Sequence, residues 1–171
     1  YADPHHTASL ASIVGGGARV AQPGSISRAH RGVLFMDEAP EFSPRVLEAL
    51  RVPLESGRVV LGRAAAQAVY PASFQLVLAS NPCPCGNAGT PGADCRCAPI
   101  AVRRYTERIS GPILDRVDIR HHLRPMSRSY LKAALGEGEP SAAVAARVSE
   151  ARERQRRRLA EHGWRTNGEV P

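Results

Sequence analysis

The 171-residue chain lacks any apolar run close to the roughly 20 residues that a membrane-spanning helix requires, so we expect a soluble protein that contacts no membrane. It also lacks a basic segment followed by an apolar one at its beginning, which favours the cytoplasm over secretion. Its four cysteines all fall between positions 83 and 97, which argues against disulfides distributed over the chain. An apolar share of 43% nevertheless provides for a hydrophobic core, so the composition excludes wholesale disorder.

Lysine is nearly absent as well, since Lys132 is the single lysine and the other 22 basic residues are arginines. The net charge is +7, and residues 101–171 alone carry +6 of it. The arginine side chain presents a planar fork of donors that suits phosphates and carboxylates, so a phosphate-bearing partner such as nucleic acid is favoured. A genome rich in G and C would also explain arginine in place of lysine, but it would not explain the sign of the charge.

Two apolar runs predict the strands of an α/β protein. Val33–Met36, which is followed by Asp37 and Glu38, is typical of a strand buried on both faces of a parallel sheet. Residues 74–79 predict a second buried strand, which ends just before Asn81.

The remaining chain predicts helices and one clear hairpin. Residues 56–73 alternate between apolar and polar and contain turn residues, which indicates a β-hairpin. Ser43 stands at the expected N-cap of the first long helix. Helices are predicted at residues 44–54, 100–109, 113–116 and 141–162, with a further helical stretch after Pro125 that breaks at residues 136–140.

Acidic and amide side chains at the ends of the two strands could carry chemistry. In nucleoside triphosphatases an aspartate in this position holds the Mg²⁺ shell and the following glutamate polarises the attacking water, which suits Asp37 and Glu38. Asn81 could hold the same water from its other side. The alternatives are acids that only cap the next helix and a plain Asn-Pro turn at Asn81.

Arg116 ends a short predicted helix and lies between Asp115 and Asp118. It could reach a phosphate in a neighbouring subunit as an arginine finger does. The alternative is a local salt bridge, which contributes little to stability when exposed.

The cysteines form the pattern C-x-C-x9-C-x-C, with thiols at Cys83, Cys85, Cys95 and Cys97. Two close pairs across a loop rich in glycine and proline could surround a tetrahedral zinc ion. Zinc knuckles usually have two residues within each pair, and the single residue here strains a site for one metal. Free thiols and redox-active disulfides therefore stay open as alternatives.

Three segments together resemble the magnesium-chelatase-like AAA+ ATPases of the ComM/YifB type. They are GVLFMDEAPEF (32–42), PASFQLVLASNPCPCG (71–86) and RISGPILDRVDI (108–119), and the PHHTAS block (4–9) belongs to the same pattern. The likeness covers most of residues 4–125 and is only general beyond them.

The resemblance implies a three-layer AAA+ P-loop NTPase core with inserted β-hairpins and the start of a helical lid. The core would span residues 1–125, a connecting helix and linker 126–140, and the lid 141–171. Asp37 and Glu38 would be the Walker B acids, with Asp37 on the Mg²⁺ of ATP. Asn81 would be sensor 1 and Arg116 the arginine finger, acting in trans within a homo-oligomeric ring, a hexamer.

The same resemblance implies DNA, single-stranded or branched, as the partner. In related ring helicases, hairpins corresponding to residues 11–31 and 56–73 line a central pore and touch DNA. The basic residues that they offer are Arg19, Arg28, Arg58 and Arg63. Phosphate contacts by arginines suit binding that does not depend on sequence, although each could also be a solvated surface residue.

The chain contains no G-x-x-x-x-G-K-[ST] motif, whose amides and lysine cradle the phosphates of ATP. In the family this P-loop precedes the PHHT block, so we expect a chain that begins after it and does not hydrolyse ATP alone. The leading interpretation is a DNA-remodelling ATPase of the kind associated with ComM-like branch migration. The alternatives are a magnesium chelatase subunit for tetrapyrrole metallation, against which the cysteine segment speaks, and a non-catalytic, zinc-stabilised module that binds nucleic acid.

Overall fold

The computed structural model forms two compact units, unit 1 (Tyr1–Arg124) and unit 2 (Pro125–Pro171). The residues that it describes are 1–17, 20–62, 67–90, 92–123, 126, 138–167 and 170.

The centre of unit 1 is a pair of parallel strands, β3 (Val33–Met36) and β6 (Gln75–Leu78). Both strands lie where the apolar runs predict them. The N-terminal segment lies along the other side of β3, where Ala2 forms a parallel bridge with Leu34. The Ala2 N–H donates to the carbonyl of Val33, and the Ala2 carbonyl accepts from the N–H of Phe35, both at 2.9 Å. The chain is therefore a mixed α/β protein with a small parallel sheet.

The two strands differ in burial. Leu34 and Met36 of β3 are fully buried. In β6, Leu76 and Leu78 are half-buried, and Val77 is exposed on the other face. The expectation of a second fully buried strand is therefore wrong, because one face of β6 packs on the core and the other faces solvent in the described part of the chain.

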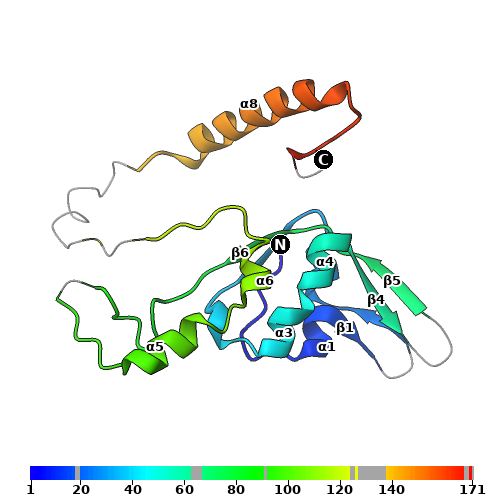
Figure 1. Cartoon of the computed structure of the whole chain (residues 1–171). Coiled ribbons are helices and arrows are strands. Elements are labelled where there is room, and N and C mark those ends of the chain that lie inside the picture. The colour runs from blue at the N-terminus through cyan, green and yellow to red at the C-terminus, as the bar shows by residue number, and fades with distance from the viewer. Residues whose placement is uncertain are drawn as a thin grey trace. The chain divides into compact units, whose positions relative to one another are not determined.

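Two antiparallel hairpins accompany this sheet (Figure 1). The first pairs β1 (Gly15–Gly16) with β2 (Gln22–Pro23), and the second pairs β4 (Arg58–Gly62) with β5 (Gln67–Pro71). The second hairpin confirms the alternation in residues 56–73. The hydroxyl of Tyr70 donates to the carbonyl of Ala21 at 2.6 Å, so β5 is tied to the chain that enters β2.

Short helices cover the core of unit 1. Ser43 caps α3 as predicted, since its hydroxyl accepts from the Val46 N–H at 3.3 Å. The helical pattern of residues 44–54 is divided into α3 and α4 at Leu50. The helices of unit 1 are α1 (Leu10–Val14), α2 (Ser25–Arg28), the 3-10 helix η1 (Ala39–Glu41), α3 (Pro44–Ala49), α4 (Arg51–Ser56), α5 (Pro99–Thr106) and α6 (Gly111–Leu114).

The core gathers apolar side chains mainly from the segment between Ala2 and Leu78, together with Ile109 and Ile113. Phe42 and Leu47 come from the chain after β3, and Val59 and Leu61 come from β4. The other buried members are Ile13, Ile26, Ala29, Leu34, Met36, Val46, Leu50, Ala72 and Ile113. Burial of an aliphatic or aromatic side chain contributes about 1.5–3 kcal/mol, so this cluster is the main source of stability for the sheet edge described below.

In its described residues, unit 2 contains the long helix α8 (Ser141–Ala160) and the short segment after it. Leu159 is buried, whereas Val144 and Val148 of the same helix are exposed. Many of its arginines pair with acids one turn away, as Arg154 does with Glu150. The helical stretch predicted after Pro125 lies outside the described residues. No helix in the described part of the chain is both long and apolar enough to cross a bilayer.

Candidate functional site

The carboxyl ends of β3 and β6 meet at one edge of the sheet. Met36 is in register with Leu78, and the Ala79 N–H donates to the Met36 carbonyl at 3.0 Å. The Ala39 N–H then donates back to the Ala79 carbonyl at 2.8 Å. These bonds tie together the two segments that carry the predicted residues. We call this place the carboxylate edge and define it by Asp37, Glu38 and Asn81, which are all exposed.

Glu38 has an unusual backbone conformation. Its φ of 51° and ψ of 43° lie in the left-handed region, which costs a non-glycine residue about 1–2 kcal/mol. Asp37 offsets part of this cost, because its Oδ1 accepts from the Glu38 N–H at 2.8 Å. The carbonyl of Glu38 accepts from the Glu41 N–H at 2.7 Å at the start of η1. Backbone strain of this kind concentrates at functional sites, because the surroundings must hold it in place.

His6 joins the carboxylate edge, and sequence reasoning did not assign it there. Its Nδ1 lies 3.1 Å from Oε2 of Glu38. The register of the sheet explains this contact. Ala2 pairs with Leu34 in a parallel bridge, so His6 and Glu38, each four residues further along the chain, reach the same edge of the sheet. Neighbouring His5 lies with its Nδ1 2.8 Å from the Thr7 hydroxyl, and its ring centroid is 4.1 Å from that of His6.

Tyr105 of α5 is the second residue that sequence reasoning missed. Its side chain is buried, and its phenol faces the backbone N–H of Asn81, which favours the ionised form. Burial raises the pKa of the Tyr105 phenol, the negative charges of Glu41 and Glu38 raise it further, and these effects outweigh that of Asn81. The phenol is therefore neutral at physiological pH and lies beside the backbone at Asn81. A tyrosine in a short helix gives no local signal for this contact.

Arg116 lies away from these contacts. It follows α6, forms an ion pair with Glu55 of α4, and donates to the carbonyl of Pro112. Its side chain is 26% exposed, and its Nε atom is buried without a partner in the described part of the chain. Within one subunit, Arg116 therefore braces α6 against α4 and is not part of the carboxylate edge.

The four predicted cysteines do come together. Cys83, Cys85, Cys95 and Cys97 have sulfurs that all lie within 4.8 Å of one another. They belong to residues 83–97, which we call the cysteine loop and which connect the chain after β6 to α5. All four are free thiols, and the cluster could hold a metal ion.

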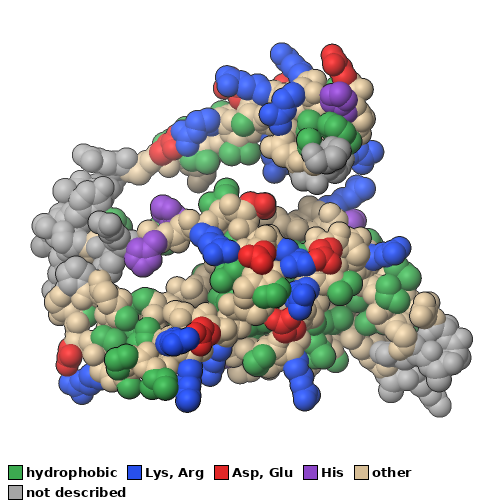
Figure 2. Space-filling view, viewed as in Figure 1, with side chains coloured by type: hydrophobic (Ala, Val, Ile, Leu, Met, Phe, Trp, Pro, Cys, Tyr) green, Lys and Arg blue, Asp and Glu red, His purple; other side chains and the backbone are tan. Residues whose placement is uncertain are grey.

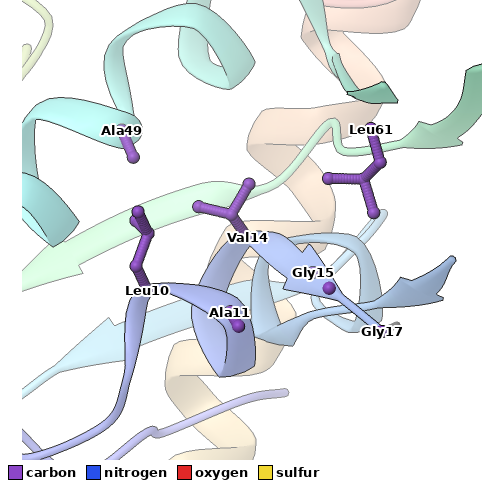
Figure 3. A pocket seen from close by; sticks show the side chains of 8 residues that line it. Leu10, Ala11, Val14, Gly15, Gly17, Ala49 and Leu61 are labelled. Carbon is purple, nitrogen blue, oxygen red and sulfur yellow. The ribbon is translucent and has the colours of Figure 1, made fainter. Parts of the chain in front are cut away.

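An apolar hollow of about 750 Å³ lies elsewhere in unit 1, between α1, β1, α3 and β4. Figure 3 shows Leu10 reaching toward Ala49, with Val14 between Leu10 and Leu61. Among the described residues, no charged or amide side chain lines it. The candidate chemistry therefore stays at the carboxylate edge.

The predicted DNA contacts are described only in part. Arg28 is exposed at the end of α2, and Arg58 is exposed at the start of β4. Arg19 and Arg63 lie outside the described residues. Figure 2 shows acidic and basic side chains interspersed over this face of unit 1, so the positive charge does not form one continuous patch there.

A parallel α/β sheet that delivers paired carboxylates and an amide to one edge is compatible with a P-loop NTPase domain. The model of the family described as "Magnesium chelatase, subunit ChlI" matches residues 1–131, and the chain belongs to this family.

Curated relatives agree with this assignment. An uncharacterized protein of Mycobacterium tuberculosis (strain H37Rv) is 52% identical over 98% of the chain. The uncharacterized protein YifB of Escherichia coli is 49% identical over 92%, and the competence protein ComM of Haemophilus influenzae is 46% identical over 91%. These alignments cover 32%, 31% and 30% of the three relatives, so the chain spans about a third of their length. The resemblance to the ComM/YifB type is confirmed.

Proposed function

We propose that this chain carries the hydrolytic side of the nucleotide site of an ATP-driven ring motor that remodels DNA. The observation that supports it most is the register of the sheet, which gathers Glu38, Asp37 and the Asn81 backbone at one edge. The chain as printed holds no P-loop, so hydrolysis requires a polypeptide that also carries one. The proposed setting is a three-layer AAA+ core, with residues 141–171 beginning a lid.

The residues at the edge fit Mg²⁺ and ATP. Exposed carboxylate oxygens are the ligands that Mg²⁺ accepts, and Asp37 is the residue that would hold it. When bound, Mg²⁺ neutralises charge on the transferring phosphate. Glu38 would accept the proton of the attacking water, and Asn81 would orient that water with its side-chain amide. His6 and Tyr105 would position Glu38 and Asn81 rather than touch the substrate.

Arg116 is proposed to act on the nucleotide of a neighbouring subunit. Its place outside the carboxylate edge of its own subunit suits that role, because an arginine that acts in trans must lie away from its own site. The proposed assembly is a homo-oligomeric ring of six subunits. The proposed location is the cytoplasm, because a reducing compartment suits four free thiols.

DNA is the proposed partner because the two hairpins are tied together and present arginines. Tyr70 joins β5 to Ala21, so the two hairpins are held together, and exposed Arg58 begins β4 while exposed Arg28 ends α2. The name of ComM, a competence protein, favours DNA as well. Guanidinium contacts to phosphates would give affinity without sequence preference.

The family description favours a second candidate, the ATPase subunit of a magnesium chelatase. In that case the same carboxylate edge would hydrolyse ATP, but DNA would have no effect. The motor proposal is preferred because the alignment with ComM extends over 91% of the chain.

The test is ATP hydrolysis by a polypeptide that joins this chain to a P-loop segment, measured with and without single-stranded DNA. We expect turnover that DNA stimulates and that Glu38→Gln lowers by about 100-fold or more, because a general base contributes that much. Glu107→Gln on α5 is the matched control, since Glu107 pairs only with Arg103 in the described contacts. Turnover indifferent to DNA would favour the chelatase. DNA binding without turnover would favour a non-catalytic module.

A further inference from the structure

Secondary structure and burial contribute little to the stability of the cysteine loop. In its described part it contains no helix or strand, and Cys83 is its single buried residue. Its backbone hydrogen bonds are local turns, such as Gly86 N–H to the Cys83 carbonyl at 3.0 Å. Ordering a residue costs about 1–2 kcal/mol of conformational entropy, and burial of apolar surface does not offset that cost here.

The sulfurs are nevertheless placed close together. Cys83 Sγ lies 3.4 Å from Cys85 Sγ and 3.8 Å from Cys95 Sγ, and the last two lie 3.7 Å apart. With Zn–S bonds of about 2.3 Å, the sulfurs of a tetrahedral site are about 3.8 Å apart. These three distances are close to one face of such a tetrahedron, despite the short C-x-C pairs, and Cys97 Sγ lies within 4.8 Å of the other three sulfurs.

We propose that Cys83, Cys85, Cys95 and Cys97 bind one structural zinc ion, which closes the loop between β6 and α5. Four thiolates around one centre, with no open position, are typical of a structural zinc site. A multi-iron cluster would distribute the cysteines over different irons. The proposal goes beyond ATP hydrolysis and stands without it.

Because of where the cysteine loop lies, a bound zinc ion would affect the position of Asn81. Cys83 follows Asn81 by two residues, and Cys97 precedes α5, which begins at Pro99, by two residues. The same helix carries buried Tyr105, whose phenol faces the backbone N–H of Asn81. The zinc would therefore join both chain segments that fix Asn81 at the carboxylate edge.

The first experiment measures metal in the full chain purified under reducing conditions. We expect about one zinc per chain by elemental analysis, as a four-thiolate structural site requires. Replacement by cobalt should give the intense red-region absorption of tetrahedral cobalt and a thiolate-to-cobalt charge-transfer band. Neither readout depends on a variant that must fold.

Variants then assign the ligands. Cys85→Ser removes an exposed ligand and should abolish stoichiometric zinc and the cobalt spectrum. Asp94→Asn is the matched control, because Asp94 lies in the same loop, pairs only with exposed Arg96 in the described contacts, and should leave both unchanged.

Three results would overturn the proposal. The first is a chain that stays zinc-free after zinc is supplied and keeps four thiols that react freely. The second is a mass that shows the cysteines joined as disulfides in the native protein. The third is stoichiometric iron, with or without sulfide, in place of zinc.

Discussion

The carboxylate edge collects its residues from three separate parts of the chain, whereas the cysteine loop takes all four sulfurs from residues 83–97. The edge depends on the parallel register of Ala2, β3 and β6, which rests on a buried core. The loop has one buried residue and local turns. A site built from distant segments is as stable as the fold that aligns them. A site built within one loop needs its own cross-link.

The two regions meet at Asn81, and this contact makes the comparison testable. Damage to the edge should change catalysis and leave the metal in place. Damage to the loop should remove the metal first and affect Asn81 second. The predictions below separate these patterns.

The largest effect is expected for Arg116→Ala, which should lower turnover by about 1,000-fold, the range known for arginine fingers, while zinc content stays constant. Mixing Arg116→Ala subunits with Glu38→Gln subunits should restore part of the activity, because one interface then has both groups. Glu55→Gln is the control, since it removes the intrasubunit partner of Arg116. A loss of equal size in Glu55→Gln would mean that Arg116 acts only as a brace.

Tyr105→Phe should have the next largest effect. It removes the hydroxyl that faces the Asn81 N–H, which we expect to cost about 0.5–1.5 kcal/mol of unfolding free energy and also to lower turnover. Tyr70→Phe is the matched control: it removes a hydroxyl that donates to Ala21, so it should destabilise the hairpins without lowering the turnover measured in the absence of DNA. Denaturant unfolding and ATPase assays measure the two effects. Equal turnover in both variants would remove Tyr105 from the site.

The raised pKa of Tyr105 adds a pH signature. The folded state then retains a proton that the unfolded chain loses near pH ~10, so the unfolding free energy should fall as the pH rises above that value. Tyr105→Phe should remove this part of the decrease. An identical alkaline decrease in the variant would contradict the assignment.

His6→Ala should have a smaller effect on the same edge. It removes the partner of the Glu38 carboxylate, worth about 0.5–1.5 kcal/mol, so turnover should fall by a few-fold with nucleotide affinity unchanged. His5→Ala is the control, because His5 bonds Thr7 instead. Equal losses in the two variants would indicate a general disturbance of the N-terminal segment.

Sequence reasoning reached the parts of the fold that local pattern encodes. The apolar run 33–36, the alternation in 56–73 and the cap at Ser43 each carry their own signal, and the structure confirms all three. The sequence also predicted that Asp37, Glu38 and Asn81 lie near one another, because each follows an apolar run that reads as a strand. The exposed face of β6 could not be predicted, because burial depends on which elements pack against a strand.

The positioning residues had no such local signal. His6 reaches Glu38 through the register of an N-terminal segment that forms a single bridge with β3. Tyr105 reaches Asn81 across the whole cysteine loop. The Arg116 contact with Glu55 likewise joins helices distant in sequence. Contacts of this kind follow from the assembled tertiary structure, and composition or spacing cannot indicate them.

The smallest effect is expected at the hairpins, which resemble the carboxylate edge in being joined from distant segments. If Arg28 and Arg58 each contact one phosphate, Arg28→Ala and Arg58→Ala should each lower the slope of log affinity for single-stranded DNA against log salt by about 0.7. Arg103→Ala on α5, an exposed arginine paired with Glu107, is the control and should leave the slope unchanged. Zinc content should stay constant in all three. Fluorescence anisotropy over a salt series measures the slopes. Unchanged slopes for Arg28→Ala and Arg58→Ala would exclude these two arginines from the DNA contact.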